Sequence, residues 1–117
     1  MGNTKFAVNN HEGITISCDD NRWNDHIVFE HEIMRNNSKA VKDTVKDPES
    51  VYQSAENENR EVYFKASSYS TYKIKTKVVV EYSESKNGNV KGEVVTAFPS
   101  KDERGNIGEI VYRKPQN

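Results

Sequence analysis

The chain has 117 residues, of which 33% are hydrophobic and 30% are charged, and its formal net charge at pH 7 is −1. This length suits one domain, and the near-zero charge excludes a global attraction to nucleic acid or membranes, so any polyanion site must be a local patch. The single cysteine, Cys18, excludes an internal disulfide, and no apolar run is long enough to span a bilayer.

The chain begins with polar residues. We expect residues 1–13 to form a loosely ordered lead-in that can contain a short strand, within one domain that covers residues 1–117. Apolar and polar residues then alternate over residues 14–17, and this alternation predicts a short strand.

Two helices are predicted next. The first is predicted from the spacing of Trp23, Ile27, His31 and Met34. These residues follow one another at steps of four, four and three, so they share one helix face. The second begins at Ser38 and ends at Asp47, because a proline disfavours the helical conformation in the residue before it.

The remainder of the chain has the pattern of an antiparallel meander. Runs of β-branched and aromatic residues predict strands at 49–54, around 62–64, and at 72–82, 93–98 and 109–113. The Asn87-Gly88 pair predicts a type I′ hairpin turn, which needs positive φ angles. Helices followed by a meander indicate an α+β fold, with N-terminal helices packed on a four- to five-stranded antiparallel sheet.

His26 and His31 lie five residues apart and are candidates for acid–base chemistry. On an α-helix this spacing corresponds to a rotation of roughly 140°, which disfavours one shared metal ion and allows two separate proton-transfer positions. The helix dipole at the first turn would keep His26 neutral and able to accept a proton. Alternatively, His31 is a hydrogen-bonded core residue on the apolar face.

Lysines alternate with other residues in the longest predicted strand. Lys73, Lys75 and Lys77 share one face as a basic stripe, which suits successive phosphates or forms an ordinary solvated face. On the returning strand, Thr96 lies between apolar neighbours. Its hydroxyl either bonds to the backbone or points at a ligand at the end of the sheet.

Metal binding has little support in this sequence. Cys18 with the two histidines would make a partial zinc site, but their spacing matches no strong metal signature. We therefore expect no metal and no cofactor.

Several short motifs follow one another over about residues 22–98: His26-Ile27, His31, Met34, Val41-x-x-Thr44-Val45-x-Asp47-Pro48-Glu49-x-Val51-Tyr52, Tyr63-Phe64, Lys77-Val78-Val79-Val80 and Val94-Val95-Thr96-Ala97-Phe98. Their order resembles the phage-barnase–EndoU–colicin–RelE-like (BECR-type) nuclease domains. The family implies a barnase/EndoU/RelE-like fold of helices on an antiparallel sheet and metal-independent RNA cleavage. Two departures stand beside the second histidine: Glu32 replaces the usual proline, and Glu30 stands where a basic residue is frequent.

The resemblance implies an endoribonuclease, as a toxin or a phage-associated domain, that cleaves RNA by attack of the 2′-hydroxyl on the adjacent phosphate. In family terms, His26, His31 and Thr96 match recurrent polar positions, and Arg22 matches a basic residue before His-Ile. We expect the two histidines to act as base and acid in either order, and Thr96 to donate to a phosphoryl oxygen. Arg22 and the lysine stripe would neutralise the RNA backbone, and Tyr63 or Tyr72 would stack on a base.

These expectations set the partners and the alternatives. The substrate would be RNA, with tRNA as one candidate, and a cognate immunity protein or antitoxin would be a protein partner, with no membrane involved. The protein would act in the cytoplasm, or be delivered or secreted as part of a toxin system. The alternatives are a catalytically inactive binding or structural module of phage or toxin origin, a zinc-dependent enzyme, and an immunity-type partner of a toxin.

Overall fold

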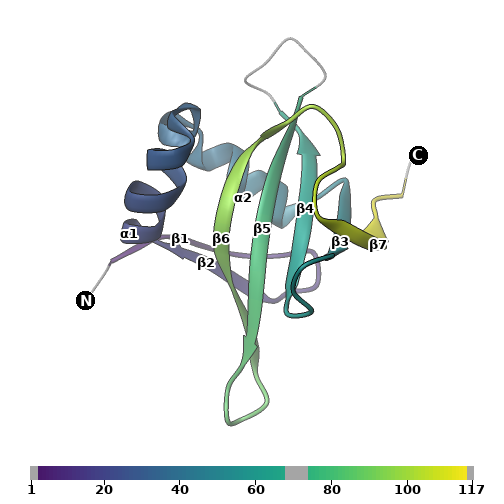
Figure 1. The fold of residues 1–117 in the computed structure, drawn as a ribbon. Coiled ribbons are helices and arrows are strands. Elements are labelled where there is room, and N and C mark those ends of the chain that lie inside the picture. The colour runs from purple at the N-terminus through teal and green to yellow at the C-terminus, as the bar shows by residue number, and fades with distance from the viewer. Residues whose placement is uncertain (1–2, 68–73, 116–117) are drawn as a thin grey trace.

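A seven-stranded mixed sheet forms the body of the computed structural model, which describes residues 3–67 and 74–115 (Figure 1). Its strands are β1 (Thr4–Asn9), β2 (Thr15–Asp19), β3 (Ser50–Ser54), β4 (Arg60–Ala66), β5 (Lys75–Glu84), β6 (Val90–Ser100) and β7 (Ile107–Arg113). They lie in the order β1-β2-β6-β5-β4-β3-β7. The β2–β6 pair is parallel, and every other neighbouring pair is antiparallel.

The helical residues lie between β2 and β3. They form α1 (Asp20–Arg22), the π-helical turn η1 (Trp23–Val28), the 3-10 turn η2 (Glu32–Asn36) and α2 (Ser38–Lys46). The Asp19 carboxylate accepts a hydrogen bond from the Arg22 backbone N–H at 2.6 Å and so caps the first of them. As predicted, α2 ends just before Pro48.

The predicted fold class was wrong. The helices are short and follow two strands, and the sheet has seven strands and one parallel pair instead of four or five antiparallel strands. The lead-in over residues 1–13 contains β1, and Asn10 closes the β1–β2 turn, because its side-chain oxygen accepts from the backbone N–H groups of Glu12 and Ile14. The meander pattern predicted the later strands. It did not predict that β2 pairs with β6 or that β7 pairs with β3.

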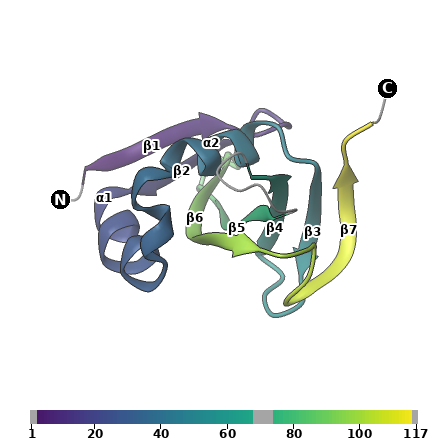
Figure 2. The ribbon, with the colours of Figure 1, turned by 90° about the horizontal axis from the view of Figure 1, so that it is seen from above.

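The two faces of the sheet are covered by different parts of the chain. One face packs against α2 and the other helical turns, with a core that includes Trp23, Ile27, Met34, Val41, Val45, Val78 and Val80. The opposite face is crossed by residues 101–106, which link β6 to β7 and which we call the connector. Figure 2 shows the sheet between α2 on one side and the path from β6 to β7 on the other.

Candidate functional site

The connector encloses a cavity of about 150 Å³ against the sheet, which we call the connector cavity. Its wall includes two cationic side chains, an aromatic ring and a hydroxyl, contributed by Arg60, Lys77, Phe98 and Thr96. Ser54 and Glu56 lie at the end of β3, and Gly105 and Asn106 belong to the connector. Two residues predicted for RNA binding and cleavage, Lys77 and Thr96, are therefore brought together.

Lys77 is unusual because its side chain is buried, with the residue 6% exposed. Its ammonium donates to the carbonyl oxygens of Arg104 at 3.0 Å and Gly105 at 2.8 Å, and it lies 5.2 Å from the centre of the Phe98 ring. No carboxylate in residues 3–67 and 74–115 forms an ion pair with it. Desolvation lowers the pKa of Lys77, because burial penalises the charged form.

Thr96 lines the connector cavity because the β5–β6 pairing contains an irregularity. Val79 pairs with Thr96 but Val80 pairs with Val94, so the register shifts at Val95. Strict alternation therefore fails here: Val94 belongs to the core, whereas Val95 and Thr96 both line the cavity. The buried Thr96 hydroxyl has no hydrogen-bond partner among the residues described, so the predicted bond to the backbone is not formed.

His31 reaches the same region through an aromatic contact. Its ring stacks on Phe98, with centroids 4.8 Å apart and planes inclined by 29°. Phe98 is also in contact with Lys77 and lines the connector cavity. The carboxylate of Glu32, which follows His31 in sequence, is taken up by a bidentate pair with Arg35 at 2.7 and 2.9 Å. The arginine offsets the negative charge that this departure from the family pattern introduces beside His31.

His26 lies in the π-helical turn η1, and its imidazole Nδ1 is 3.5 Å from the Glu30 carboxylate. The carboxylates on either side of His31 thus pair elsewhere, Glu30 with His26 and Glu32 with Arg35. The α-helical rotation assumed for the two histidines does not apply across this turn. The π-helical turn ends at Val28, so it contains His26 but not His31.

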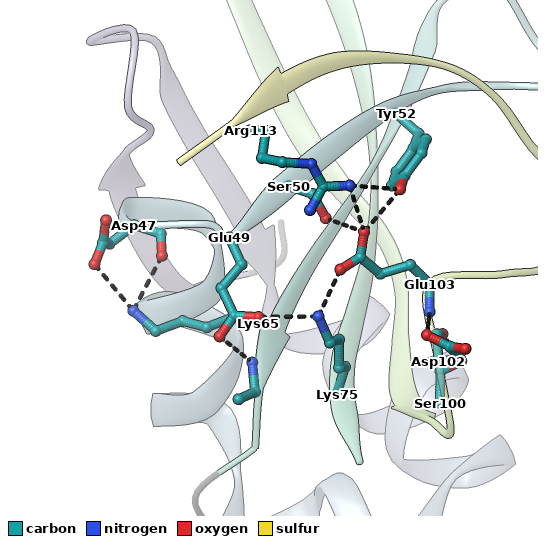
Figure 3. A network of polar contacts seen from close by, with 11 residues as sticks. Asp47, Glu49, Ser50, Tyr52, Lys65, Lys75, Ser100, Asp102, Glu103 and Arg113 are labelled. Atoms are coloured by element: carbon teal, nitrogen blue, oxygen red, sulfur yellow. Dashed lines mark hydrogen bonds and ion pairs between the residues drawn. The ribbon is translucent and has the colours of Figure 1, made fainter. Parts of the chain in front are cut away.

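The lysine stripe is oriented as predicted over the part of the strand that the structure describes, but it is not free. Lys75 and Lys77 share the connector face of β5, while Lys73 lies outside the described residues, as does Tyr72. The Lys75 ammonium is bound by two carboxylates, those of Glu49 at 3.0 Å and Glu103 (Figure 3). These two partners neutralise Lys75 and leave little charge for a phosphate.

Two further predicted binding residues lie away from the connector cavity. Tyr63 is fully buried in the core, where its hydroxyl is bonded to Asn10 and Tyr82, and burial raises its pKa to about 12. Its ring is therefore not available to stack on a base in this conformation. Arg22 is exposed and lines a different cavity, together with the acidic residues Asp19 and Glu93.

The sequence analysis did not predict the contacts that three residues make in this region. Glu30 had a signal, because a carboxylate four residues after a histidine on a helix faces it. Arg60 and Phe98 had none. Arg60 enters the cavity wall because β4 pairs with β5, where it forms an ion pair with Glu81 at 3.0 Å, and the role of Phe98 depends on its contact with a helical segment far away in sequence.

The zinc alternative is disfavoured by the position of Cys18. The thiol is buried in the core, and desolvation together with the neighbouring Asp19 raises its pKa to about 12, so the thiolate that zinc requires is costly to form. Within the described ranges, no three histidine, cysteine, aspartate or glutamate side chains are grouped to hold a metal ion. The same residues contain no helix long and apolar enough to cross a membrane.

Comparison of the chain with protein-family models, with curated proteins and with solved structures found no match.

Proposed function

We propose that this protein is a metal-independent endoribonuclease that uses the 2′-hydroxyl of RNA as the nucleophile. The observation that carries the proposal is the stack of His31 on Phe98, because it joins a titratable imidazole to the cavity that contains Lys77 and Thr96. A general acid or base, a cation and a hydroxyl are the groups that in-line attack on a phosphodiester needs.

The roles follow from the contacts of each side chain. Glu30 holds Nδ1 of His26, which leaves Nε2 to take the proton from the 2′-hydroxyl. His31 protonates the leaving 5′-oxygen, and the ammonium of Lys77 offsets the charge that develops on the phosphate. Thr96 donates its unpartnered hydroxyl to a phosphoryl oxygen once the substrate displaces the connector from above it.

The test is cleavage of total RNA and tRNA in the presence of EDTA. We expect the wild type to cleave and to leave 2′,3′-cyclic phosphate ends, and we expect His26→Ala and His31→Ala each to lower the rate by about 10²- to 10⁴-fold, the usual contribution of a proton-transfer group. His11→Gln is the matched control, because the third histidine lies in the β1–β2 turn against Tyr112. An RNA whose 2′-hydroxyls are replaced by hydrogen should not be cleaved.

Two results would contradict the proposal. Unchanged rates in both histidine variants, with circular dichroism showing that they fold, would remove the histidines from the mechanism. Loss of wild-type activity in EDTA, restored by added zinc, would favour the metal-dependent alternative.

One observation favours a second candidate, a binding module without catalysis. Phe29 and Ile33 are 83% and 52% exposed, and each lies two residues from His31 in the sequence. Apolar side chains grouped in this way mark protein interfaces. This candidate predicts no RNA cleavage by the wild type, and binding to a protein partner that Phe29→Ser abolishes.

A further inference from the structure

A second concave surface lies between β1 and α2, and we call it the β1–α2 groove. Its volume is about 500 Å³. Residues 6–8 of β1 form one wall, and Lys39, Lys42, Asp43 and Lys46 of α2 form the other. Figure 2 shows α2 beside β1, on the side of the sheet away from the connector. The groove is thus separate from the cavity to which ribonuclease activity is attributed.

The groove follows the open edge of the sheet. β1 is a terminal strand, paired on one side with β2 and with no strand on its other side among the described residues. Successive side chains of a strand point to opposite faces, yet Phe6, Ala7 and Val8 all line the groove. Because three successive residues of one strand line it, the groove reaches the strand edge, where alternate backbone N–H and C=O groups lack a partner strand.

The helical wall of the groove is positively charged. Lys39 is paired with Asp43 at 2.8 Å, but Lys42 and Lys46 have no carboxylate partner in the described part of the chain. Three lysines against one aspartate leave a local excess of two positive charges, in a chain whose net charge is −1. Like charges held together on a solvated wall favour a negatively charged ligand.

The spacing of these charges fits an extended peptide. Lys42 and Lys46 are four residues apart, which at 1.5 Å per residue is about 6 Å along the helix axis. Side chains on one face of a strand recur about every 6.6–6.8 Å. Acidic residues at alternate positions of an added strand therefore match the two lysines that lack partners.

We infer that the β1–α2 groove binds an acidic peptide segment, which adds to the sheet as a strand beside β1. The open edge supplies hydrogen bonds to the peptide backbone, and the lysines of α2 attract the acidic side chains on the face that the peptide turns toward the helix. Nucleic acid shares the negative charge of such a peptide, but its sugar-phosphate backbone cannot continue the hydrogen-bond ladder of a sheet. This inference does not depend on the proposed ribonuclease activity.

The probe for this groove is a fluorescein-labelled peptide of alternating glutamate and valine, blocked at both ends. We expect saturable binding by fluorescence anisotropy, weakened about tenfold or more by the double substitution Lys42→Glu and Lys46→Glu because two attractions become repulsions. Lys86→Glu with Lys91→Glu is the matched control, since both residues are exposed at the β5–β6 hairpin. A peptide with proline at its centre should bind more weakly, because it lacks a backbone donor.

Nuclear magnetic resonance locates the contact. Amide shift changes should be confined to β1 and α2. The inference is overturned if the glutamate–valine peptide shows no saturable binding at millimolar concentration, or if the groove and hairpin variants weaken it equally. It is also overturned if oligodeoxythymidine, which has no 2′-hydroxyl and so resists 2′-hydroxyl attack, shifts the groove amides while the peptide does not, because the groove would then be a nucleic-acid site.

Discussion

Glu103 is a single side chain on which donors from three strands converge. Its carboxylate accepts from Ser50 and Tyr52 of β3, from Lys75 of β5 and from Arg113 of β7, and its side chain is only 12% exposed (Figure 3). Burial alone would raise its pKa, but the hydrogen bonds from Lys75, Tyr52 and Ser50 outweigh it and lower the pKa to about 2. One residue of the connector thereby fastens it to the sheet.

This carboxylate should make the protein sensitive to acid. Because the folded pKa of about 2 lies below the ordinary value of 4.5, the contribution of Glu103 is fully present above pH 4.5 and is lost as the pH falls toward 2. At about 1.4 kcal/mol per pKa unit, it amounts to about 3 kcal/mol at neutral pH. Urea unfolding of the wild type and of Glu103→Gln between pH 7 and pH 2 measures it.

The variant should be less stable at pH 7 and should lose less stability on acidification. Glu58→Gln is the control, because this exposed glutamate forms no ion pair within the described residues. Parallel acid profiles for the wild type and Glu103→Gln would show that the carboxylate makes no net contribution.

At the scale of elements, the β1–β2 hairpin joins the rest of the sheet through a short parallel contact. Ile16 pairs with Gly92 and Ser17 with Glu93, whereas β5 and β6 pair over most of their length. A Cβ placed on Gly92 would lie 2.6 Å from Cδ1 of Ile16 and 2.8 Å from Cγ1 of Val80, both fully buried. The close approach of β2 to β6 therefore requires a glycine at this position.

Gly92→Ala should destabilise the protein by about 1–3 kcal/mol, the usual cost of adding volume to a packed core. Thermal unfolding measures this loss, with Val90→Ala, an exposed position of the same strand, as the control. A melting temperature of Gly92→Ala no lower than that of the control would show that β2 and β6 separate without cost.

The sequence patterns predicted single elements better than their contacts. β3 to β7 and α2 lie where alternation, the Asn87-Gly88 turn and Pro48 placed them, because these signals are local. The bulge at Val95 and the π-helical turn depend on neighbours contributed by other segments, so simple periodicities failed at both. The sequence pattern likewise predicted that Lys75 and Lys77 share a face. It did not predict the carboxylates that pair with Lys75 or the carbonyl oxygens that accept hydrogen bonds from Lys77.

At the scale of the whole molecule, what the sequence did not reveal was the order of the strands. β7 follows β6 in the chain but pairs with β3, so three strands lie between β6 and β7, and the connector has to cross the sheet to span them. This crossing creates the cavity around Lys77 and Thr96. A local sequence pattern carries no information about such a crossing. The sequence therefore identified the candidate residues but did not predict which of them lie together.

Stability should be unevenly distributed over this sheet. β5 is central and flanked by two long pairings, whereas β7 is an edge strand whose residues 108–111 are exposed and whose pairing with β3 is twice irregular. Native-state hydrogen exchange should therefore show β7 amides opening with a smaller free energy than β5 amides, which exchange only on global unfolding. Equal opening free energies for the two strands would show that the sheet unfolds as one cooperative unit.

The contact of Lys77 with the connector constrains how this protein can diverge. Gly105 has a φ of +90°, and a Cβ at that position would lie 2.7 Å from the Lys77 ammonium. L side chains rarely adopt this φ, so a side chain at position 105 is strained whichever residue stands at position 77, and it would also displace the Lys77 ammonium. In natural variants of this chain we expect glycine to persist at position 105 even where position 77 changes, while the exposed connector positions 101, 102 and 104 vary.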